Sequence, residues 1–262
     1  MTTIDLSIEL ADGVLSVTLN RPDSLNSLTA AMLTGIADTL EHAAGDPRVR
    51  VVRLGGAGRG FSSGAGISQE DQAHPGTSGT PGDVLDAANR AVSSIVNLPQ
   101  PVVAAVQGPA AGVGASLALA CDVVLASEKA FFMLAFTKIG LMPDGGASAL
   151  IAAAVGRIRA MRMALLAERI GAAEALEWGL VTAVYPADQF DVEVSKVVSQ
   201  LVSGPAVALR KTKDAINAAT LTELDAAMER ERRGQLALLG ADDFREGTRA
   251  FQQRREAKFS DS

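Results

Sequence analysis

The chain has 262 residues, a formal net charge of −6 at pH 7 and an isoelectric point near 5.0. This acidic balance argues against nucleic-acid binding as the main function. Aromatic residues make up only 4% of the chain and apolar residues 48%, so the core is expected to consist mainly of Ala, Val, Leu and Ile.

The composition also disfavours a secreted or membrane-spanning protein. Cys121 is the one cysteine in the sequence and therefore cannot form an internal disulfide. The longest apolar stretch, near 108–126, is interrupted by glycines and by Asp122, and no apolar segment follows a basic N-terminus. We expect a cytoplasmic protein. The two histidines form no cluster with the cysteine, so no metal site is predicted.

The first half of the chain alternates strands and helices. IDLSIELADGVLSVTLNRP alternates apolar and polar residues on both sides of Asp12-Gly13, which predicts a hairpin. SLTAAMLTGIADTLEHAAGD has the pattern of an amphipathic helix with Thr29 as its N-cap. The further expected elements are the strand VRVVRLGG, the glycine-rich loop GAGRGFSSGAGISQE, a mobile segment at 72–82, the helix DVLDAANRAVSSIVNLP, the strand PVVAAVQG, the turn and helix GPAAGVGASLALACD, and the strands VVLAS and AFFML.

Helices dominate the second half. The expected helices are 145–155, 157–167, 172–178, 187–202, 205–218, 221–239 and 241–257. In this half, LVTAVY is the only strand that we predict. The pattern indicates an α/β fold without internal repeats.

Two glycine motifs are too weak to carry a function. Gly60-Phe61-Ser62-Ser63-Gly64 fits the G-x-S-x-G turn of serine hydrolases, but the only later histidine is His74, in the segment expected to be mobile. The glycine pairs 58/60 and 112/114 each lack the third glycine of a dinucleotide-binding turn.

Both glycine-rich turns follow a predicted buried strand, and this arrangement allows two interpretations. They can be simple tight connections. Alternatively, peptide N–H groups at such turns, one of them opening a helix, can converge on one thioester oxygen and stabilise an enolate.

Asp144, in AFTKIGLMPDGGASAL, also allows two interpretations. It can be the N-cap of the helix that follows, where its side chain would accept hydrogen bonds from free backbone N–H groups. It can instead be a general base facing a pocket. The stretch alone does not decide between them.

Several segments resemble the crotonase (enoyl-CoA hydratase/isomerase) superfamily. They are LNRPDSLNSLTAAM, RGFSSGAGI, VVAAVQGPAAGVGASLALACDVVLASEKAFF, KIGLMPDGGASALI, GAAEALEWGLVTAVYP and EGTRAFQQRREAKF, which occur in the family's order over nearly the whole chain. The resemblance implies a spiral of β-β-α units at 1–200, with the acyl-CoA site, and a C-terminal helical region for oligomerisation at 201–262. It also implies a homotrimer or a hexamer made of two trimers.

The resemblance assigns the site residues. The two N–H donors to the thioester oxygen would be those of Ala65 and Val113. The residues expected to contact the substrate or its coenzyme A are Ser24, Leu25, Ser63, Gly64, Ile67, Gly112, Ser116, Phe136 and Arg254. Gly66 stands where the family usually has Asp, which puts the packing of the first loop in question.

The departures from the family pattern determine the expected chemistry. Ser116 and Phe136 occupy the positions of the two glutamates that hold water in the hydratases. Asp144 falls where isomerases of the family have their base, and apolar neighbours such as Leu141 and Met142 would raise its pKa. Glu70 and Asp71 are weaker candidates, expected to be solvated loop acids.

We therefore expect an enoyl-CoA double-bond isomerase that uses Asp144 and the two amides. One alternative is a 2-enoyl-CoA hydratase in which Asp144 and Ser116 hold the water. Another is a non-catalytic acyl-CoA binding or carrier protein. Coenzyme A is expected only as part of the thioester substrate, without a tightly bound cofactor, a nucleic acid or a membrane as partner.

Overall fold

The computed structural model describes residues 5–67 and 80–261. A six-stranded sheet has the order β1-β2-β3-β4-β6-β9, and a three-stranded sheet has the order β5-β7-β8. In the larger sheet β1 and β2 are antiparallel and the other neighbours are parallel. Its strands are β1 (Leu6–Ala11), β2 (Val14–Leu19), β3 (Val51–Gly56), β4 (Val102–Val106), β6 (Val123–Ser127) and β9 (Ala183–Tyr185); those of the smaller sheet are β5 (Pro109–Ala111), β7 (Phe131–Met133) and β8 (Ile170–Gly171).

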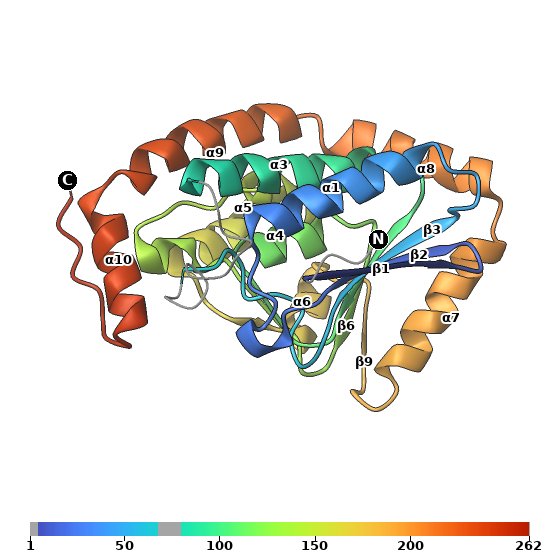
Figure 1. The fold of residues 1–262 in the computed structure, drawn as a ribbon, viewed down its shortest axis with the longest axis horizontal. Helices are drawn as coiled ribbons and strands as arrows, with labels where there is room; N and C mark the ends of the chain where they lie inside the picture. The colour runs from blue at the N-terminus through green and yellow to red at the C-terminus, as the bar shows by residue number, and fades with distance from the viewer. Residues whose placement is uncertain (1–4, 68–79, 262) are drawn as a thin grey trace.

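Helices cover both faces of the larger sheet. The α-helices are α1 (Ala30–Ala44), α3 (Pro81–Asn97), α4 (Val113–Leu119), α5 (Ala147–Leu166), α6 (Ala172–Trp178), α7 (Phe190–Ser203), α8 (Ala206–Thr220), α9 (Leu224–Leu239) and α10 (Asp242–Gln252); the 3-10 turns are η1 (Pro22–Ser24) and η3 (Ala135–Ile139). Helices α1 and α3 lie together on one side of the sheet and α7 on the other, while α10 lies at the far end of the molecule from α7 (Figure 1).

Strand β4 explains why both faces are covered. All five of its residues, VVAAV, are buried. Val102, Ala104 and Val106 belong to the main core under α1 and α3, whereas Val103 and Ala105 pack with Phe190, Val194 and Val198 of α7. A parallel strand buried on both faces has this continuous apolar pattern.

Two local sequence signals are confirmed. Asp12 and Gly13 both have positive φ, at 49° and 83°, as a two-residue hairpin turn between β1 and β2 requires. The Thr29 side chain accepts a hydrogen bond from the backbone N–H of Met32 at 3.2 Å and caps α1.

Several element predictions need correction. Helix α3 begins at Pro81, before the expected Asp83, because Thr80 and Asp83 form a capping box. The two helices expected at 145–155 and 157–167 are joined in α5, with a break at Gly156, where φ is 77° and ψ is 163°. The short strands β5 and β8, which both pair with β7, were not predicted. The helix expected at 241–257 ends earlier, at Gln252.

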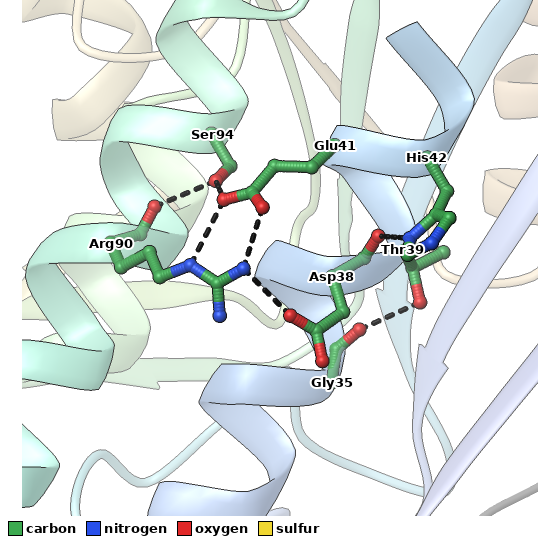
Figure 2. A network of polar contacts seen from close by, with 7 residues as sticks. All are labelled: Gly35, Asp38, Thr39, Glu41, His42, Arg90 and Ser94. Carbon is green, nitrogen blue, oxygen red and sulfur yellow. Dashed lines mark hydrogen bonds and ion pairs between the residues drawn. The ribbon is translucent and has the colours of Figure 1, made fainter. Parts of the chain in front are cut away.

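A polar cluster links α1 to α3 at the surface. The Arg90 guanidinium of α3 lies between the carboxylates of Asp38 and Glu41 of α1, with its Nη2 2.7 Å from Asp38 Oδ1 (Figure 2). Ser94 adds a hydrogen bond to Glu41 at 3.1 Å. Exposed pairs of this kind contribute about 0–1 kcal/mol, so the apolar contact between the helices holds them together.

The C-terminal helices pack against this core. Helix α7 runs past position 200 to Ser203, and the division of the chain at that position stays a prediction. Helix α8 is attached by Lys213, whose Nζ lies 2.8 Å from Asp122 Oδ2 and donates to the carbonyl oxygens of Ile95 and Gln100. Both side chains of the ion pair are largely buried. Among the described residues, no helix combines the length and hydrophobicity needed to cross a membrane.

This buried ion pair predicts the result of a substitution. Burial raises the pKa of Asp122, and the Lys213 ammonium opposes that shift. Lys213→Met leaves Asp122 buried without its cation, so we expect the free energy of unfolding to fall by about 3–5 kcal/mol. Urea unfolding at fixed protein concentration measures the change.

The matched control is Lys196→Met, which removes the exposed cation of the Lys196–Glu193 pair on α7. A change of about 1 kcal/mol or less is expected there. Equal effects of the two substitutions would contradict a special role for Lys213.

Candidate functional site

The two glycine-rich turns lie side by side. Ser62 and Ala110 form a parallel bridge, in which the Ala111 N–H donates to the Ser62 carbonyl oxygen at 2.9 Å. A Cβ at Gly64 would lie 2.8 Å from the Ala111 carbonyl oxygen and 3.5 Å from the Gly112 Cα. Gly64 and Gly112 also have positive φ, at 94° and 52°. Only glycine therefore allows this close approach without strain.

The N–H groups of Ala65 and Val113 follow these glycines. Leu28 donates to the Gly64 carbonyl oxygen and accepts from the Gly66 N–H, so Ala65 between them directs its own N–H elsewhere. Val113 is the first residue of α4, whose initial N–H groups have no partner within the helix. Within the described part of the chain, neither the Ala65 nor the Val113 N–H has a backbone acceptor.

Several residues expected to contact coenzyme A lie next to the first turn. The Ser63 N–H donates to the Leu25 carbonyl oxygen at 2.8 Å, and the Ser63 hydroxyl donates to the Ser24 carbonyl oxygen at 3.0 Å. The Gln252 amide of α10 donates to the Ile67 carbonyl oxygen at 2.9 Å. The chain end that carries the exposed Arg254 is thereby held near the same loop.

Ser62 has a structural role. Its side chain is fully buried, and its hydroxyl donates to the Asn26 carbonyl oxygen at 2.9 Å and accepts from the Gly64 N–H at 3.1 Å. It holds the glycine turn in place, which agrees with setting the hydrolase motif aside. Glu70, Asp71 and His74 lie outside the described residues.

Asp144 lies at the junction of α4, α5 and α9. Only 5% of the residue is exposed. Its backbone carbonyl oxygen accepts from the Ser116 hydroxyl of α4 at 2.9 Å, and its Oδ2 accepts from the Gln235 amide of α9 at 2.8 Å. Asp144 Oδ1 is buried and has no partner among the described residues. Ser116 thus bonds to the backbone of a residue far away in the sequence and not to a carbonyl oxygen of its own helix.

The structure does not support the interpretation of Asp144 as an N-cap. The residue before α5 is Gly146, without a side-chain cap. The carboxylate of Glu231, from α9, instead accepts from the N–H groups of Gly146 at 2.7 Å and Ser148 at 2.8 Å. Glu231 therefore provides at this helix terminus the acceptors that Asp144 was considered to supply.

Burial raises the pKa of Asp144 to about 7. The hydrogen bond from Gln235 favours the charged carboxylate and opposes this shift, whereas the nearby Glu231 adds to it. Burial also raises the pKa of Glu231, although its backbone N–H donors act in the other direction. A carboxyl group with a pKa near 7 can exchange a proton close to neutral pH.

The positions of the family's two water-holding glutamates carry no acid. The buried ring of Phe136 lies beside the second glycine turn, where its Cζ would be 3.9 Å from a Cβ at Gly112. Ser116 is fully buried and its hydroxyl bonds to Asp144. Leu141 and Met142 are only partly buried, and Met142 packs against Gly234 of α9.

Sequence reasoning missed Glu231 and Gln235. The buried residues of α9 are Leu224, Ala227, Met228, Glu231 and Gln235, which recur every three or four positions along one stripe. Two polar residues on an apolar stripe are a signal for a buried hydrogen-bonding role. That signal was available in the sequence.

Comparison with known proteins identifies the family. The model of the family described as Enoyl-CoA hydratase/isomerase matches residues 9–262. A 1,2-epoxyphenylacetyl-CoA isomerase from Escherichia coli is 36% identical over 249 residues, which are 95% of each chain.

Solved structures extend this comparison. An enoyl-CoA hydratase from Mycobacterium avium subsp. paratuberculosis has 68% identity and a TM-score of 0.92, covering 98% of this chain and 99% of that one. An enoyl-CoA hydratase/isomerase from Pseudoalteromonas atlantica has 34% identity and a TM-score of 0.87, covering 98% of this chain and all of that one. The predicted crotonase fold is confirmed, and the chain belongs to the enoyl-CoA hydratase/isomerase family of enzymes.

Proposed function

We propose that the enzyme is an enoyl-CoA double-bond isomerase in which Asp144 is the acid–base group. One observation carries this proposal: Oδ1 of the Asp144 carboxyl is buried and has no hydrogen-bond partner among the described residues. Burial raises the pKa of the group to about 7, which suits a base at neutral pH. Its neighbours at the family's glutamate positions, Ser116 and Phe136, supply no second base.

A single carboxylate suffices for the reaction. Asp144 removes a proton from the α-carbon of a 3-enoyl thioester, and the electron pair of that C–H bond moves into a dienolate. The carboxylic acid so formed returns the proton to the γ-carbon, and the 2-enoyl thioester results. No water is consumed and the base ends in its starting state.

The dienolate needs a partner for its oxygen. The N–H groups of Ala65 and Val113 are in the right place in the family pattern, and neither has a backbone acceptor in the described part of the chain. Loss of one such donor typically costs about 3–4 kcal/mol of transition-state stabilisation. We place the substrate's coenzyme A along Ser24, Leu25, Ser63 and Arg254.

The hydrogen bond of Ser116 makes hydration the weaker candidate. Water addition needs one group to activate the water and another to deliver the proton. The Ser116 hydroxyl, the expected second group, donates instead to the Asp144 carbonyl oxygen.

The Escherichia coli relative favours a second candidate reaction at the same site. It is named a 1,2-epoxyphenylacetyl-CoA isomerase. An epoxide-bearing acyl-CoA is therefore the second substrate to test with the purified enzyme.

We further propose a homotrimer or a pair of trimers in the cytoplasm. The second half of α5 supports an interface, because Ile158, Leu165 and Leu166 are 77%, 61% and 59% exposed. Light scattering after gel filtration should give a mass of three or six chains. A monomer would contradict this assembly.

The role of Asp144 predicts a large loss of activity on substitution. Asp144→Asn keeps the shape and removes the base, so conversion of 3-enoyl-CoA to 2-enoyl-CoA should fall by about 10²–10⁴-fold. Absorbance of the conjugated thioester follows the reaction, and acyl-CoA binding should persist.

Asp214→Asn, at an exposed position on α8, is the matched control and should keep full activity. Undiminished activity of Asp144→Asn would remove Asp144 from the mechanism. Wild-type enzyme that binds acyl-CoA without exchanging an α-proton with deuterated water would support the carrier alternative, and hydration of 2-enoyl-CoA would support the hydratase.

The pH dependence of the wild-type reaction gives another prediction. Only ionised Asp144 can accept a proton, and its pKa is raised to about 7. The value of kcat/KM should therefore rise with pH and level off above an apparent pKa near 7. A profile that is flat from pH 5 to 8 would rule out a base with this pKa.

The ionisation of Asp144 should also make the free energy of unfolding depend on pH. The pKa of Asp144 is raised from 3.8 to about 7 on folding, so the folded state binds more protons between these values. The stability that the protonated group supplies at low pH is lost as the pH rises through about 7. The free energy of unfolding of Asp144→Asn, relative to that of wild type, should therefore be about 1–4 kcal/mol larger at pH 8 than at pH 4. Denaturant unfolding at the two pH values measures this gain, and equal differences would contradict it.

A further inference from the structure

The two oxygens of the Asp144 carboxyl have different surroundings. Oδ2 accepts a hydrogen bond from the Gln235 Nε2 at 2.8 Å. Oδ1 is equally buried but has no partner among the described residues. A buried acceptor without a partner is unfavourable, so this asymmetry requires a reason in function or packing.

The Gln235 amide is held in one orientation. Its Oε1 accepts from the Met142 N–H at 3.1 Å, and this bond requires the oxygen to face Met142. The Nε2 donors therefore face Asp144. Gln235 is only 1% exposed, so water does not compete for these bonds. The side chain joins α9 to both ends of the segment 142–144.

Glu231 lies one helical turn before Gln235 on the same face of α9. Its two oxygens accept from the N–H groups of Gly146 and Ser148, and the residue is 1% exposed. The charge of Glu231 is thereby fixed near Asp144, while its oxygens are occupied. Glu231 is not placed to accept a proton from a substrate.

Helix α9 is itself attached to the core. The Arg232 guanidinium forms an ion pair with Asp86 of α3 at 2.7 Å, and Leu224, Ala227 and Met228 are buried on the same stripe as Glu231 and Gln235. The helix therefore provides a rigid support for side chains that contact the 142–148 segment.

We propose that Gln235 is a positioning residue: it occupies Oδ2 of Asp144 and leaves Oδ1 as the oxygen that carries the proton during isomerisation. Glu231 is a fixed negative charge that opposes the effect of Gln235 on the Asp144 carboxylate. The inference rests on the proposed function of Asp144. It assigns to the C-terminal helical region a part in the chemistry besides its predicted part in assembly.

The two side chains act on the base in opposite directions. Gln235 donates to the carboxylate and favours its ionised form, whereas Glu231 is a like charge and disfavours it. Two further polar side chains at this junction are neutral: the Ser116 hydroxyl from α4 bonds to the Asp144 carbonyl oxygen, and the Ser148 side chain from α5 bonds to Glu231. The cation that acts on Glu231 is Arg230, which is largely exposed.

The test compares the pH profiles of two variants. Gln235→Met removes the hydrogen-bond donor at nearly constant side-chain volume. The low-pH limb of the kcat/KM profile should therefore shift to higher pH by about one unit, and kcat at neutral pH should fall about tenfold or more. Glu231→Gln removes the like charge, so the limb should move down. KM for the acyl-CoA should change little in either variant, because neither residue is placed at the coenzyme.

Matched controls separate these effects from general damage. Glu229→Gln makes the same change on the exposed face of α9, and Gln200→Met repeats the other change at an exposed position on α7. Neither should move the limb. If Gln235→Met fails to fold, Gln235→Glu keeps the acceptor for the Met142 N–H and should also move the limb up.

The outcomes separate the positioning role of Gln235 and Glu231 from the proposed role of Asp144 as the base. The positioning role would be overturned if the folded Gln235 and Glu231 variants had the same low-pH limb of kcat/KM as the wild-type enzyme, even when Asp144→Asn is inactive. Shifts of both limbs in the same direction would also overturn it. Full activity of Asp144→Asn would instead overturn the proposed function.

Discussion

Burial of one incompletely bonded carboxyl group determines what this site can do. The 142–148 segment brings Asp144 between α4 and α9, where desolvation raises its pKa to about 7. Hydrogen bonds to the neighbouring backbone offset the unfavourable free energy of burying this group. Ser116 donates to the Asp144 carbonyl oxygen, and Glu231 accepts from the N–H groups of Gly146 and Ser148. Asp144 Oδ1, which has no partner among the described residues, stays buried because these bonds fix the surrounding backbone.

The order of the strands in the sheet positions the two amides that we propose as the second part of the site. β3 and β4 are parallel neighbours, with Gly55 opposite Ala105, so the chain leaves both strands at the same edge. The two glycine turns then continue side by side through the Ser62–Ala110 bridge. Sheet order thus brings Ala65 and Val113, which are far apart in the sequence, to adjacent turns. Positive φ at Gly64 and Gly112 allows the backbones to approach closely.

Local signals predicted the parts of the molecule that short segments specify. The Asp12-Gly13 turn and the Thr29 cap depend on neighbouring residues, and both were predicted correctly. The surroundings of Asp144 depend on Gln235, 91 residues away, and no local pattern connects the two. β8 has only two residues and carries no periodic signal. The start of α3 was missed because Pro81 and Gly82 suggested a loop, whereas proline is favoured in the first turn of a helix.

The glycine pair after Asp144 keeps the Asp144 carboxyl away from the N-terminus of α5. Gly145 and Gly146 both have positive φ, at 65° and 73°, and this turn places Asp144 before the start of α5 without making it the cap. N–H groups at the start of a helix act to lower the pKa of a carboxylate that accepts them, and for Glu231 they oppose the effect of burial. Glu231 accepts those N–H groups instead. Asp144 can therefore remain desolvated, with one oxygen bonded to Gln235. This division of roles between two acids is consistent with the single-base reaction that we propose.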